Sequence, residues 1–416
     1  MKASVLVVVH AGAARLDDGL ASLEPYAGHP EVEVILVDNG SPDRCGEVAA
    51  RRFPWAKVVR SEANLGFAGG VCLGAEAARG EVLLLLNDDA AAGAGWLEAH
   101  LAALDRHPEA AATAGRLTSW DGIRHDFVRG AVTFDVHAFQ LGQGWPLAEI
   151  APPAAGEPLP FPCGGNMAVR RADWDRVGGF DRELFAYFED VDLGWRLWAA
   201  GRQVVAAPAA VARHRGSVTS AGLGNFGRGV LFERNALRTF FACADAEHRQ
   251  ALGMAVTATF LHRLASFATL NPEAAHLTAD PFGPVPPPVS RRERWRRRLA
   301  ERGPLGAARH LLARLLLGPL AGLPVLEDGY LLMQLRAARG FFSGLEHSEA
   351  RRRALDAVRV VPDRELLARF PRLVVPTYAG DQEWFASAAF ASLLPAGWPL
   401  EHRALDQVLH PSVLAR

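Results

Sequence analysis

Residues 1–90 alternate between short apolar runs and segments with helical spacing. Three of the apolar runs are nearly continuous rather than polar at every second position, namely Val5–Val9, Val32–Val37 and Val82–Leu86. Strands of this kind are buried on both faces, which is typical of a parallel sheet with helices on either side. We therefore predict an α/β fold built on a mostly parallel sheet flanked by helices.

Polar turns follow these strands. The second strand ends at Asp38, the third runs into Asn87-Asp88-Asp89, and a short strand between them is followed by Asn64-Leu65-Gly66. Ligands of open α/β sheets bind beyond the carboxyl ends of the strands, so we expect these turns to form one site. Taken singly, each turn has a structural alternative: a turn cap at Asp38, a helix N-cap at Asn64 and a solvated loop at Asp89.

Composition narrows the class of protein. The 416 residues carry a formal net charge of -1, so the overall charge does not favour nucleic acid. Four cysteines without a CxxC pair predict reduced thiols in a cytosolic protein. The chain enters its first strand without a signal peptide, and no apolar run reaches the roughly 18 residues of a transmembrane helix. We therefore expect a cytoplasmic protein.

Glycines and acids gather in a second region, Cys163–Trp198. A Gly-Gly pair opens it, and Glu189, Asp190 and Asp192 stand where an apolar run gives way to helical spacing. Acids in a first turn suit the positive end of a helix dipole. From these residues alone, a structural role and a catalytic role both remain open.

Taken in order, six segments of the chain resemble the family 2 glycosyltransferases, especially the bacterial rhamnosyltransferase-like and galactofuranosyltransferase-like members. The segments are ILVDNGSPD, NLGFAGG, LLLLNDDA, GGNMAVRR, GGFDRELFAYFEDVDLGWRL and ARHRGS. The resemblance covers about residues 1–235. It implies a GT-A fold, a nucleotide-sugar donor, and an inverting transfer of a hexosyl or rhamnosyl group to a glycan or lipid-linked saccharide of the cell envelope.

The resemblance also implies roles on the donor side of the site. Asp38 would contact the uracil or thymine of a UDP- or dTDP-sugar, because a carboxylate can accept a hydrogen bond from the pyrimidine ring N–H. Asn64 and Gly66 would belong to the nucleotide-side loop, Asp88 would face the sugar or ribose, and Gly165 would lie in the loop beneath the sugar.

A divalent metal is implied as well, since a diphosphate carries charge that must be offset. Asp89 occupies the last position of the family's DxD motif, and His214 aligns with a histidine that completes the metal site. Hard Mn²⁺ or Mg²⁺ prefers oxygen ligands, and imidazole suits Mn²⁺ better than Mg²⁺. Asn87 replaces the first acid of the motif, which increases the dependence on His214.

In an inverting transfer, a carboxylate takes the proton of the attacking acceptor hydroxyl. Asp190 is the expected base, with Glu189 as the alternative or as part of the acceptor pocket. Asp192 is expected to cap the helix or to pair with Arg196. The first strand departs from the family pattern, because it ends in His10-Ala11-Gly12.

The alternation stops near Phe232, so we expect a GT-A domain over residues 1–235 and a mainly helical region over 236–416. A Pro-rich linker is predicted at 280–288, and helices are predicted at Glu233–Cys243, Gln250–Leu270 and Arg309–Leu317. Six arginines surround Trp295 within Arg291–Arg298. This composition favours peripheral contact with the inner face of the cell membrane, with a solvated helix as the alternative.

Three other functions compete with this interpretation. A nucleotidyltransferase that makes sugar nucleotides shares the alternating pattern, but it usually carries a basic Gly-rich loop near the N-terminus, of which His10–Arg15 supplies little. A non-catalytic sugar-binding relative is disfavoured by Asp89, Asp190 and His214. A membrane scaffold resting on the arginines would leave the first half of the chain unexplained. The sequence leaves the donor sugar, acceptor, linkage and oligomeric state open.

Overall fold

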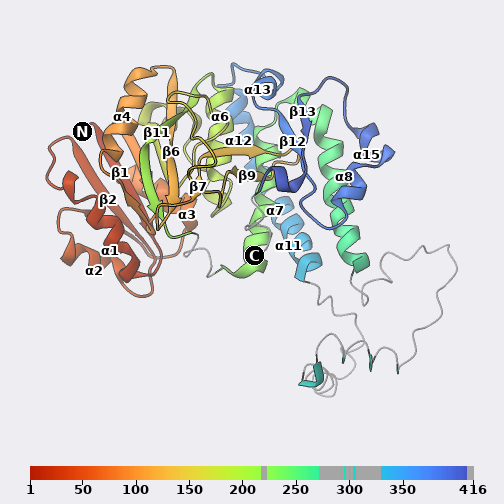
Figure 1. The fold of residues 1–416 in the computed structure, drawn as a ribbon, viewed down its shortest axis with the longest axis horizontal. Coiled ribbons are helices and arrows are strands. Elements are labelled where there is room, and N and C mark those ends of the chain that lie inside the picture. Colours follow the sequence, from red (N-terminus) through yellow and green to blue (C-terminus); the bar gives the residue numbers. More distant parts are fainter. Residues whose placement is uncertain are drawn as a thin grey trace.

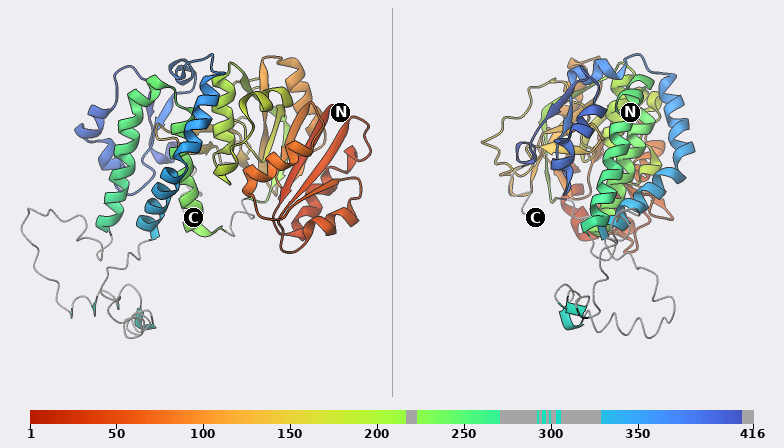
Figure 2. Two further views of the ribbon diagram at one scale, coloured as in Figure 1. Left: turned by 180° about the vertical axis from the view of Figure 1, so that it is seen from behind. Right: turned by 90° about the vertical axis from the view of Figure 1, so that its right-hand side faces the viewer.

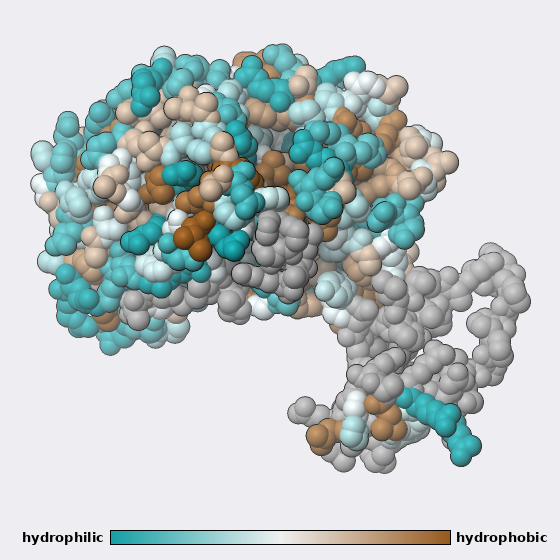
Figure 3. Space-filling model, viewed as in Figure 1, coloured by the Kyte–Doolittle hydropathy of each residue, from teal (hydrophilic) through white to brown (hydrophobic). Residues whose placement is uncertain are grey.

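The computed structural model describes residues 1–216, 223–270 and 329–409, with a few single positions between 292 and 305. A mixed β-sheet flanked by helices forms the N-terminal part, and a mainly helical C-terminal region lies beside it (Figure 1). This is the α/β architecture that the sequence predicts. On the face drawn in Figure 3, hydrophilic residues dominate the rim and hydrophobic ones gather near the middle.

The central sheet has nine strands in the order β3-β2-β1-β4-β10-β6-β11-β5, with β7 paired to β6. The strands are β1 Ala3–Val9, β2 Val32–Asn39, β3 Lys57–Ser61, β4 Val82–Leu86, β5 Ala90–Ala92, β6 Ala110–Ser119, β7 His125–Phe127, β10 Asn166–Arg170 and β11 Gln203–His214. Two small sheets pair β8 (Arg129–Val132) with β9 (Ala138–Leu141) and β12 (Arg372–Val374) with β13 (Leu400–His402).

Strands β1 to β4 are parallel, as predicted, and every residue of β1 and β4 is buried. The sheet becomes mixed at β10, which runs antiparallel to both β4 and β6. The alternation in the sequence predicts only the parallel part, because β10 follows irregular chain rather than a crossover helix. The reversal places the Gly164-Gly165 turn, just before β10, beside the end of β4, since Asn87 N donates to Gly165 O at 3.2 Å.

The pairing of β11 with β6 contains a large bulge. Between Ala206 and Val211, β11 advances by five residues while β6 advances by two, so β11 carries three extra residues. The buried side chain of Asn166 holds this region, because its Nδ2 donates to the carbonyls of Ala210 at 3.0 Å and Arg116 at 3.1 Å. The strand predicted at Gln203–Ala207 therefore continues to His214.

Six helices accompany the sheet. They are α1 Ala13–Ser22, α2 Cys45–Arg52, α3 Gly66–Ala77, α4 Trp96–Arg106, α5 Arg171–Val177 and α6 Glu189–Ala199. Helix α3 contacts β1 and β2, and α4 contacts β6 and β11. Helix α6 carries the expected acids in its first turn, and Asp192 pairs with Arg196 as predicted, with Nε donating to Oδ2 at 2.9 Å.

The C-terminal region consists mainly of helices, several of which lie side by side (Figure 2). They are α7 Gly224–Cys243, α8 Ala246–Leu270, α11 Gly329–Ser343, α12 Leu345–Asp356, α13 Asp363–Arg369, α14 Asp381–Phe385 and α15 Ala388–Leu393. Two predicted helices are confirmed within α7 and α8, whereas Arg309–Leu317 and the linker at 280–288 lie outside the described residues. Residue 235, the predicted boundary, falls inside α7, and one hydrophobic cluster continues from the sheet into this region.

Helix α8 is long and apolar enough over Ala246–Ala268 to cross a membrane, judged by length and composition only. One face of the helix is buried in the protein, whereas Met254 and Leu261 are exposed. Arg263 is buried within it and binds Asp381 through Nε and Nη2, both at 2.9 Å, and Asp135 through Nη1 at 2.6 Å. These ion pairs connect α8 both to the turn between β8 and β9 and to α14.

Candidate active site

The register of two strands brings Asp89 and His214 together. Strand β5 begins directly after Asp89 and pairs antiparallel with β11, so that Ala90 lies opposite His214. His214 Nε2 is 2.9 Å from Asp89 Oδ1, and both side chains are buried. The two residues predicted to hold a metal are therefore neighbours, and Asp88 is buried beside them in the same turn.

Asp126, in β7, completes this cluster and was missed by the sequence analysis. Its carboxylate binds His214 Nδ1, and its other oxygen accepts a hydrogen bond from Gln143 Nε2 at 3.1 Å. Burial alone would lower the pKa of His214, but the hydrogen bonds to Asp126 and Asp89 raise it to about 10. The three-residue strand β7 has no apolar run to mark it, so the sequence carried no signal for Asp126.

Asp89 and His214 fit a divalent metal once the imidazole has lost a proton, because a ligand nitrogen must be unprotonated and the raised pKa keeps the metal-free imidazole charged. Adjacent ligands of an octahedral ion bound at about 2.1 Å lie about 3 Å apart, which matches their separation of 2.9 Å. A carboxylate on the second ring nitrogen, as Asp126 is here, holds a metal-binding imidazole in one tautomer. In the described part of the chain no group of three or more His, Cys, Asp or Glu is arranged to hold a metal, so a bound substrate or water would have to supply the remaining ligands.

The Gly164-Gly165 turn connects this cluster to the acids of α6. A Cβ atom on Gly165 would lie 2.9 Å from Asn87 Nδ2, and that same Nδ2 is 3.3 Å from His214 Nε2. On the other side, Gly164 N donates to Asp190 Oδ2 at 3.0 Å. The turn thus contacts both groups of predicted residues, and a side chain at Gly165 would push against Asn87.

Glu189 and Asp190 have different environments at the start of α6. Asp190 accepts hydrogen bonds from Gly164 N and from Val191 N, the latter at 2.8 Å. Glu189 is buried, and its Oε2 has no hydrogen-bond partner among the described residues. Burial raises the pKa of both carboxyls, far more for Glu189, where the nearby Asp190 charge adds to the effect. When the surroundings of two neighbouring acids push their pKa values apart, one can act as a neutral acid and the other as a charged base.

The segment before α6 has an unusual backbone. Six non-glycine residues in the described chain have positive φ, and three of them precede α6 directly: Phe185 at 67°, Tyr187 at 69° and Phe188 at 72°. Such conformations cost on the order of 1–3 kcal/mol each and are often found at functional sites. Gly66 packs against this segment, because a Cβ atom there would lie 2.2 Å from Phe185 O. The protein backbone at Phe185 therefore approaches Gly66 closely, and the role of Gly66 in the nucleotide-side loop stays a prediction.

Asp38 and Asn64 lie in a second group, Asp38 near the end of β2 and Asn64 in the loop between β3 and α3. Asp38 is buried, binds Arg60 Nη1 at 2.8 Å and accepts a hydrogen bond from Ser41 N at 3.0 Å. Asn64 Oδ1 accepts from Asn39 Nδ2 at 3.2 Å and from Gly66 N at 2.9 Å. Asp38 thus has the local role of its structural alternative, a turn cap, whereas Asn64 is not the N-cap of α3, which is Leu65 without a side-chain cap. A role of either residue in nucleotide binding stays a prediction.

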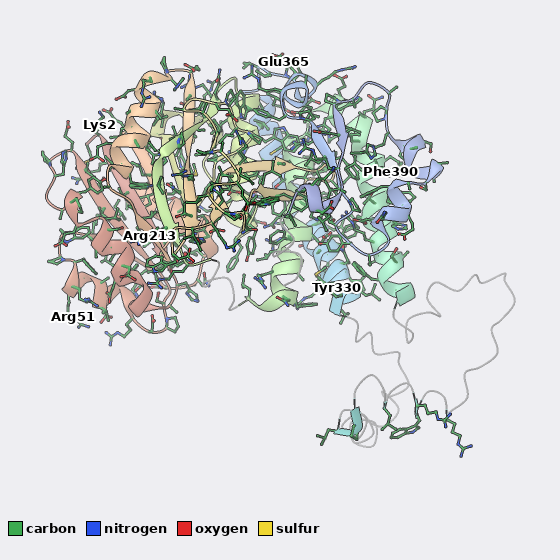
Figure 4. The ribbon with its side chains drawn as sticks, viewed as in Figure 1. Lys2, Arg51, Arg213, Tyr330, Glu365 and Phe390 are labelled. Atoms are coloured by element: carbon green, nitrogen blue, oxygen red, sulfur yellow. The ribbon has the colours of Figure 1, made fainter. Side chains whose placement is uncertain are left out.

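Two exposed arginines flank His214 in β11 and after it. The guanidinium of Arg213 lies 5.3 Å, and that of Arg215 3.7 Å, from the centre of the Trp120 ring. Figure 4 labels Arg213, which lies in β11 near the end of that strand. Cation–π contacts of this kind hold guanidinium groups in place. Arg215 also pairs with Asp18. Because neighbouring side chains of a strand point to opposite faces, the exposed Arg213 lies on the other face of β11 from the buried His214.

Comparison with known proteins identifies the family. The family described as Glycosyl transferase family 2 matches residues 4–178. The N-acetylglucosaminyl-diphospho-decaprenol L-rhamnosyltransferase of Mycobacterium tuberculosis is 33% identical over 232 residues, which cover 50% of this chain and 75% of that protein. The chain belongs to glycosyl transferase family 2. As a member of this family it is a glycosyltransferase, which confirms the class of enzyme predicted from the six segments.

Other similar proteins have lower sequence identity to this family 2 enzyme. Polypeptide N-acetylgalactosaminyltransferase 3 of Taeniopygia guttata is 26% identical over 201 residues, which cover 44% of this chain and 32% of that protein. Among solved structures, GalNAc-T7 with UDP, GalNAc and Mn²⁺ has a TM-score of 0.46 at 17% identity, covering 67% of this chain and 53% of that chain. The mannosyltransferase PcManGT from Pyrobaculum calidifontis in complex with GDP-Man and Mn²⁺ has a TM-score of 0.41 at 18% identity, covering 83% and 87%.

Proposed function

We propose that this family 2 enzyme transfers a sugar, with inversion, from a UDP- or dTDP-sugar to a glycan or lipid-linked saccharide. The observation that carries the proposal is the Gly164-Gly165 turn, which contacts Asp190 on one side and Asn87 on the other. Through Asn87 it lies next to the Asp89–His214 pair. A donor diphosphate at that pair and an acceptor hydroxyl at Asp190 would thus be neighbours across one turn.

Asp190 is the proposed base. The amides of Gly164 and Val191 favour its charged form, so it can take the proton of an acceptor hydroxyl as that oxygen attacks the anomeric carbon. Burial and the nearby Asp190 charge raise the pKa of Glu189, and in its protonated form this carboxyl can donate a hydrogen bond to the acceptor. The partly buried position of the two acids limits access of water, which would otherwise hydrolyse the donor.

Asp89 and His214 are the proposed ligands of Mn²⁺ or Mg²⁺. A bound ion of this kind would offset the charge that develops on the departing diphosphate. Asp38, Asn64 and Gly66 are proposed for the nucleoside end, with Asp88 beside the sugar or ribose and Gly165 beneath the sugar.

The name of the mycobacterial relative specifies L-rhamnose and a diphospho-decaprenol acceptor, so we propose a rhamnosyl donor and a lipid-linked saccharide as the first pair to test. A lipid-linked acceptor would place the enzyme at the inner face of the cell membrane, with peripheral contact through Arg291–Arg298. Most of that segment lies outside the described residues; Arg292, Trp295 and Arg296 are described and exposed.

Transfer assays with purified protein test the proposal. UDP-, dTDP- and GDP-sugars would each be offered with a polyprenyl-diphosphate-linked GlcNAc acceptor, and the anomeric configuration of the product would be read by NMR. We expect transfer from a uridine or thymidine donor with inverted configuration. Transfer from the guanosine donor alone, or with retained configuration, would contradict the proposal.

The metal is tested separately. Asp89→Ala should abolish Mn²⁺-dependent binding of UDP or dTDP, measured by calorimetry, because it removes the carboxylate of the pair. Asp105→Ala, on the exposed face of α4, is the matched control and should bind normally. Unchanged nucleotide affinity in Asp89→Ala with Mn²⁺ would show that the ion does not bind at the Asp89–His214 pair.

A further inference from the structure

Asn235 of α7 holds the segment Phe185–Phe188, which precedes α6 and contains three residues with positive φ. Asn235 is fully buried, and its Nδ2 lies within 2.9 Å of the carbonyl oxygens of Leu184 and Ala186 and within 2.8 Å of that of Tyr187. The neighbouring Arg234 donates through Nη2 to Leu184 O at 2.8 Å. The carbonyl groups of Leu184, Ala186 and Tyr187 thus accept hydrogen bonds from side chains in one turn of α7, which satisfies backbone groups of this irregular segment.

Further contacts hold the same segment from both sides. On the α7 side, the ring of Phe232 lies 4.7 Å from that of Tyr187 and 5.5 Å from that of Phe188, measured between centroids. Phe232 and Asn235 are three residues apart and so share a face of the helix. On the opposite side, Ala68 N in α3 donates to Phe185 O at 3.0 Å. The segment is therefore packed between α3 and α7.

The start of α6 depends on this segment. The residue before the helix, Phe188, has φ 72° and ψ -4°, and no side chain caps the first turn of α6. The direction in which Glu189 and Asp190 leave the segment is therefore set by the backbone of Phe185–Phe188 rather than by a cap. That backbone is in a conformation that non-glycine residues adopt only when their surroundings hold them there.

We propose that Asn235 is a positioning residue for the transfer reaction: its amide holds the Leu184–Tyr187 carbonyls and thereby keeps Asp190 against the Gly164 amide. Helix α7 lies beyond residues 4–178, which match the family, so this assigns part of the C-terminal region to the active site. The inference rests on the proposed function in one respect, because it takes Asp190 to be the base. An amide suits the task, since its N–H groups complement carbonyls, whereas a carboxylate would repel them.

The test compares Asn235→Ala, Asn235→Ser and Asn235→Asp with Asn225→Ala, an exposed asparagine at the start of the same helix. We expect kcat to fall by about 10²-fold in Asn235→Ala, the loss typical of a misplacement near 1 Å, while the Kd for the donor nucleotide stays unchanged. Asn235→Ser keeps one donor and should lie between wild type and alanine. Asn235→Asp should be at least as slow as alanine, and Asn225→Ala should behave as wild type.

Hydrogen exchange provides a second readout that does not involve activity. In Asn235→Ala, amides of residues 183–190 should exchange faster while the strands of the sheet exchange as in wild type. Unchanged exchange there would overturn the proposal, and so would a parallel loss of nucleotide affinity and turnover. Should alanine fail to fold, the serine variant carries both measurements. If Asp190→Asn were fully active, Asp190 would not be the base. Faster exchange at 183–190 in Asn235→Ala would even then show that Asn235 holds this segment.

Discussion

Two adjacent carboxyls at the start of α6 are distinguished by what surrounds each of them. Asp190 receives backbone N–H groups from Gly164 and Val191, whereas Glu189 keeps one buried oxygen without a partner among the described residues. The sequence pattern singled out these two acids as candidate site residues, because they stand where an apolar run gives way to helical spacing. It favoured Asp190 over Glu189 as the base, but it could not show the different surroundings of the two carboxyls, which depend on a turn that comes from a distant part of the chain.

Exchanging each acid for its amide separates their roles. Asp190→Asn should lower turnover by at least about 10²-fold, since general-base catalysis contributes roughly 10²–10⁴-fold, and should leave nucleotide affinity unchanged. Glu189→Gln should retain most of the activity, because glutamine resembles the protonated acid that burial favours. Steady-state kinetics decide; a larger loss in Glu189→Gln than in Asp190→Asn would reverse the assignment.

The pH dependence of the rate should carry the signature of a buried base. Burial raises the pKa of Asp190, and the base works only when deprotonated, so activity should fall as the pH drops through that raised pKa. The midpoint should therefore lie above the ordinary aspartate value of about 3.9. A pH profile of kcat checks this, and Asp190→Asn should lack the acid limb. An acid limb that persists unchanged in this variant would point to another group.

At the scale of elements, local patterns in the sequence predicted β1, β2, β4 and the start of α6, because continuous apolar runs and helical spacing are local signals. They did not predict the reversed direction of β10, the extension of β11 or the presence of β7. These features are set by pairing between strands far apart in the chain. As a result, the sequence located Asp89 and His214 but missed Asp126, which sits on β7.

The contact between α3 and the segment before α6 can be tested with two glycines that share one conformation. Gly66 and Gly28 have φ of 71° and 73°, but a Cβ on Gly66 would meet Phe185 O at 2.2 Å, whereas Gly28 has nothing within 4 Å. Gly28→Ala should cost about 1–2 kcal/mol of unfolding free energy for its left-handed backbone alone. Gly66→Ala should cost more and also lower turnover, measured by denaturant unfolding and kinetics. Equal effects of the two substitutions would show that the contact between Gly66 and Phe185 matters for neither stability nor turnover.

At the scale of the whole molecule, a buried group of charges joins the catalytic half to the helical half. Asp135 and His137, at the turn between β8 and β9, meet Glu233 of α7 and Arg263 of α8. Burial opposes the charged form of His137, but the two carboxylates raise its pKa to about 10. The sequence predicted helices in this region, but no local pattern indicated that they would share buried charges with the sheet domain.

Removing one member of this group should be costly. Arg263→Ala leaves Asp135 and Asp381 buried without their guanidinium partner, which typically costs 3–5 kcal/mol. Arg353→Ala breaks an exposed pair with Glu349 and should cost roughly 0–1 kcal/mol. Denaturant unfolding of the two variants and the wild type measures both. A loss in Arg263→Ala no larger than in Arg353→Ala would show that the two halves do not depend on this contact.

The bulge in β11 has a consequence for the length of that strand. Side chains alternate between the faces of a strand only where it is regular, and the three extra residues between Ala206 and Val211 are left outside the ladder. The face that His214 occupies is instead set by the pairing of Val211–His214 with β6 and of Ala212–His214 with β5. Insertion or removal of a residue within 207–210 should therefore change the size of the bulge and leave the imidazole beside Asp89. This stretch is where the strand can vary in length without moving the site.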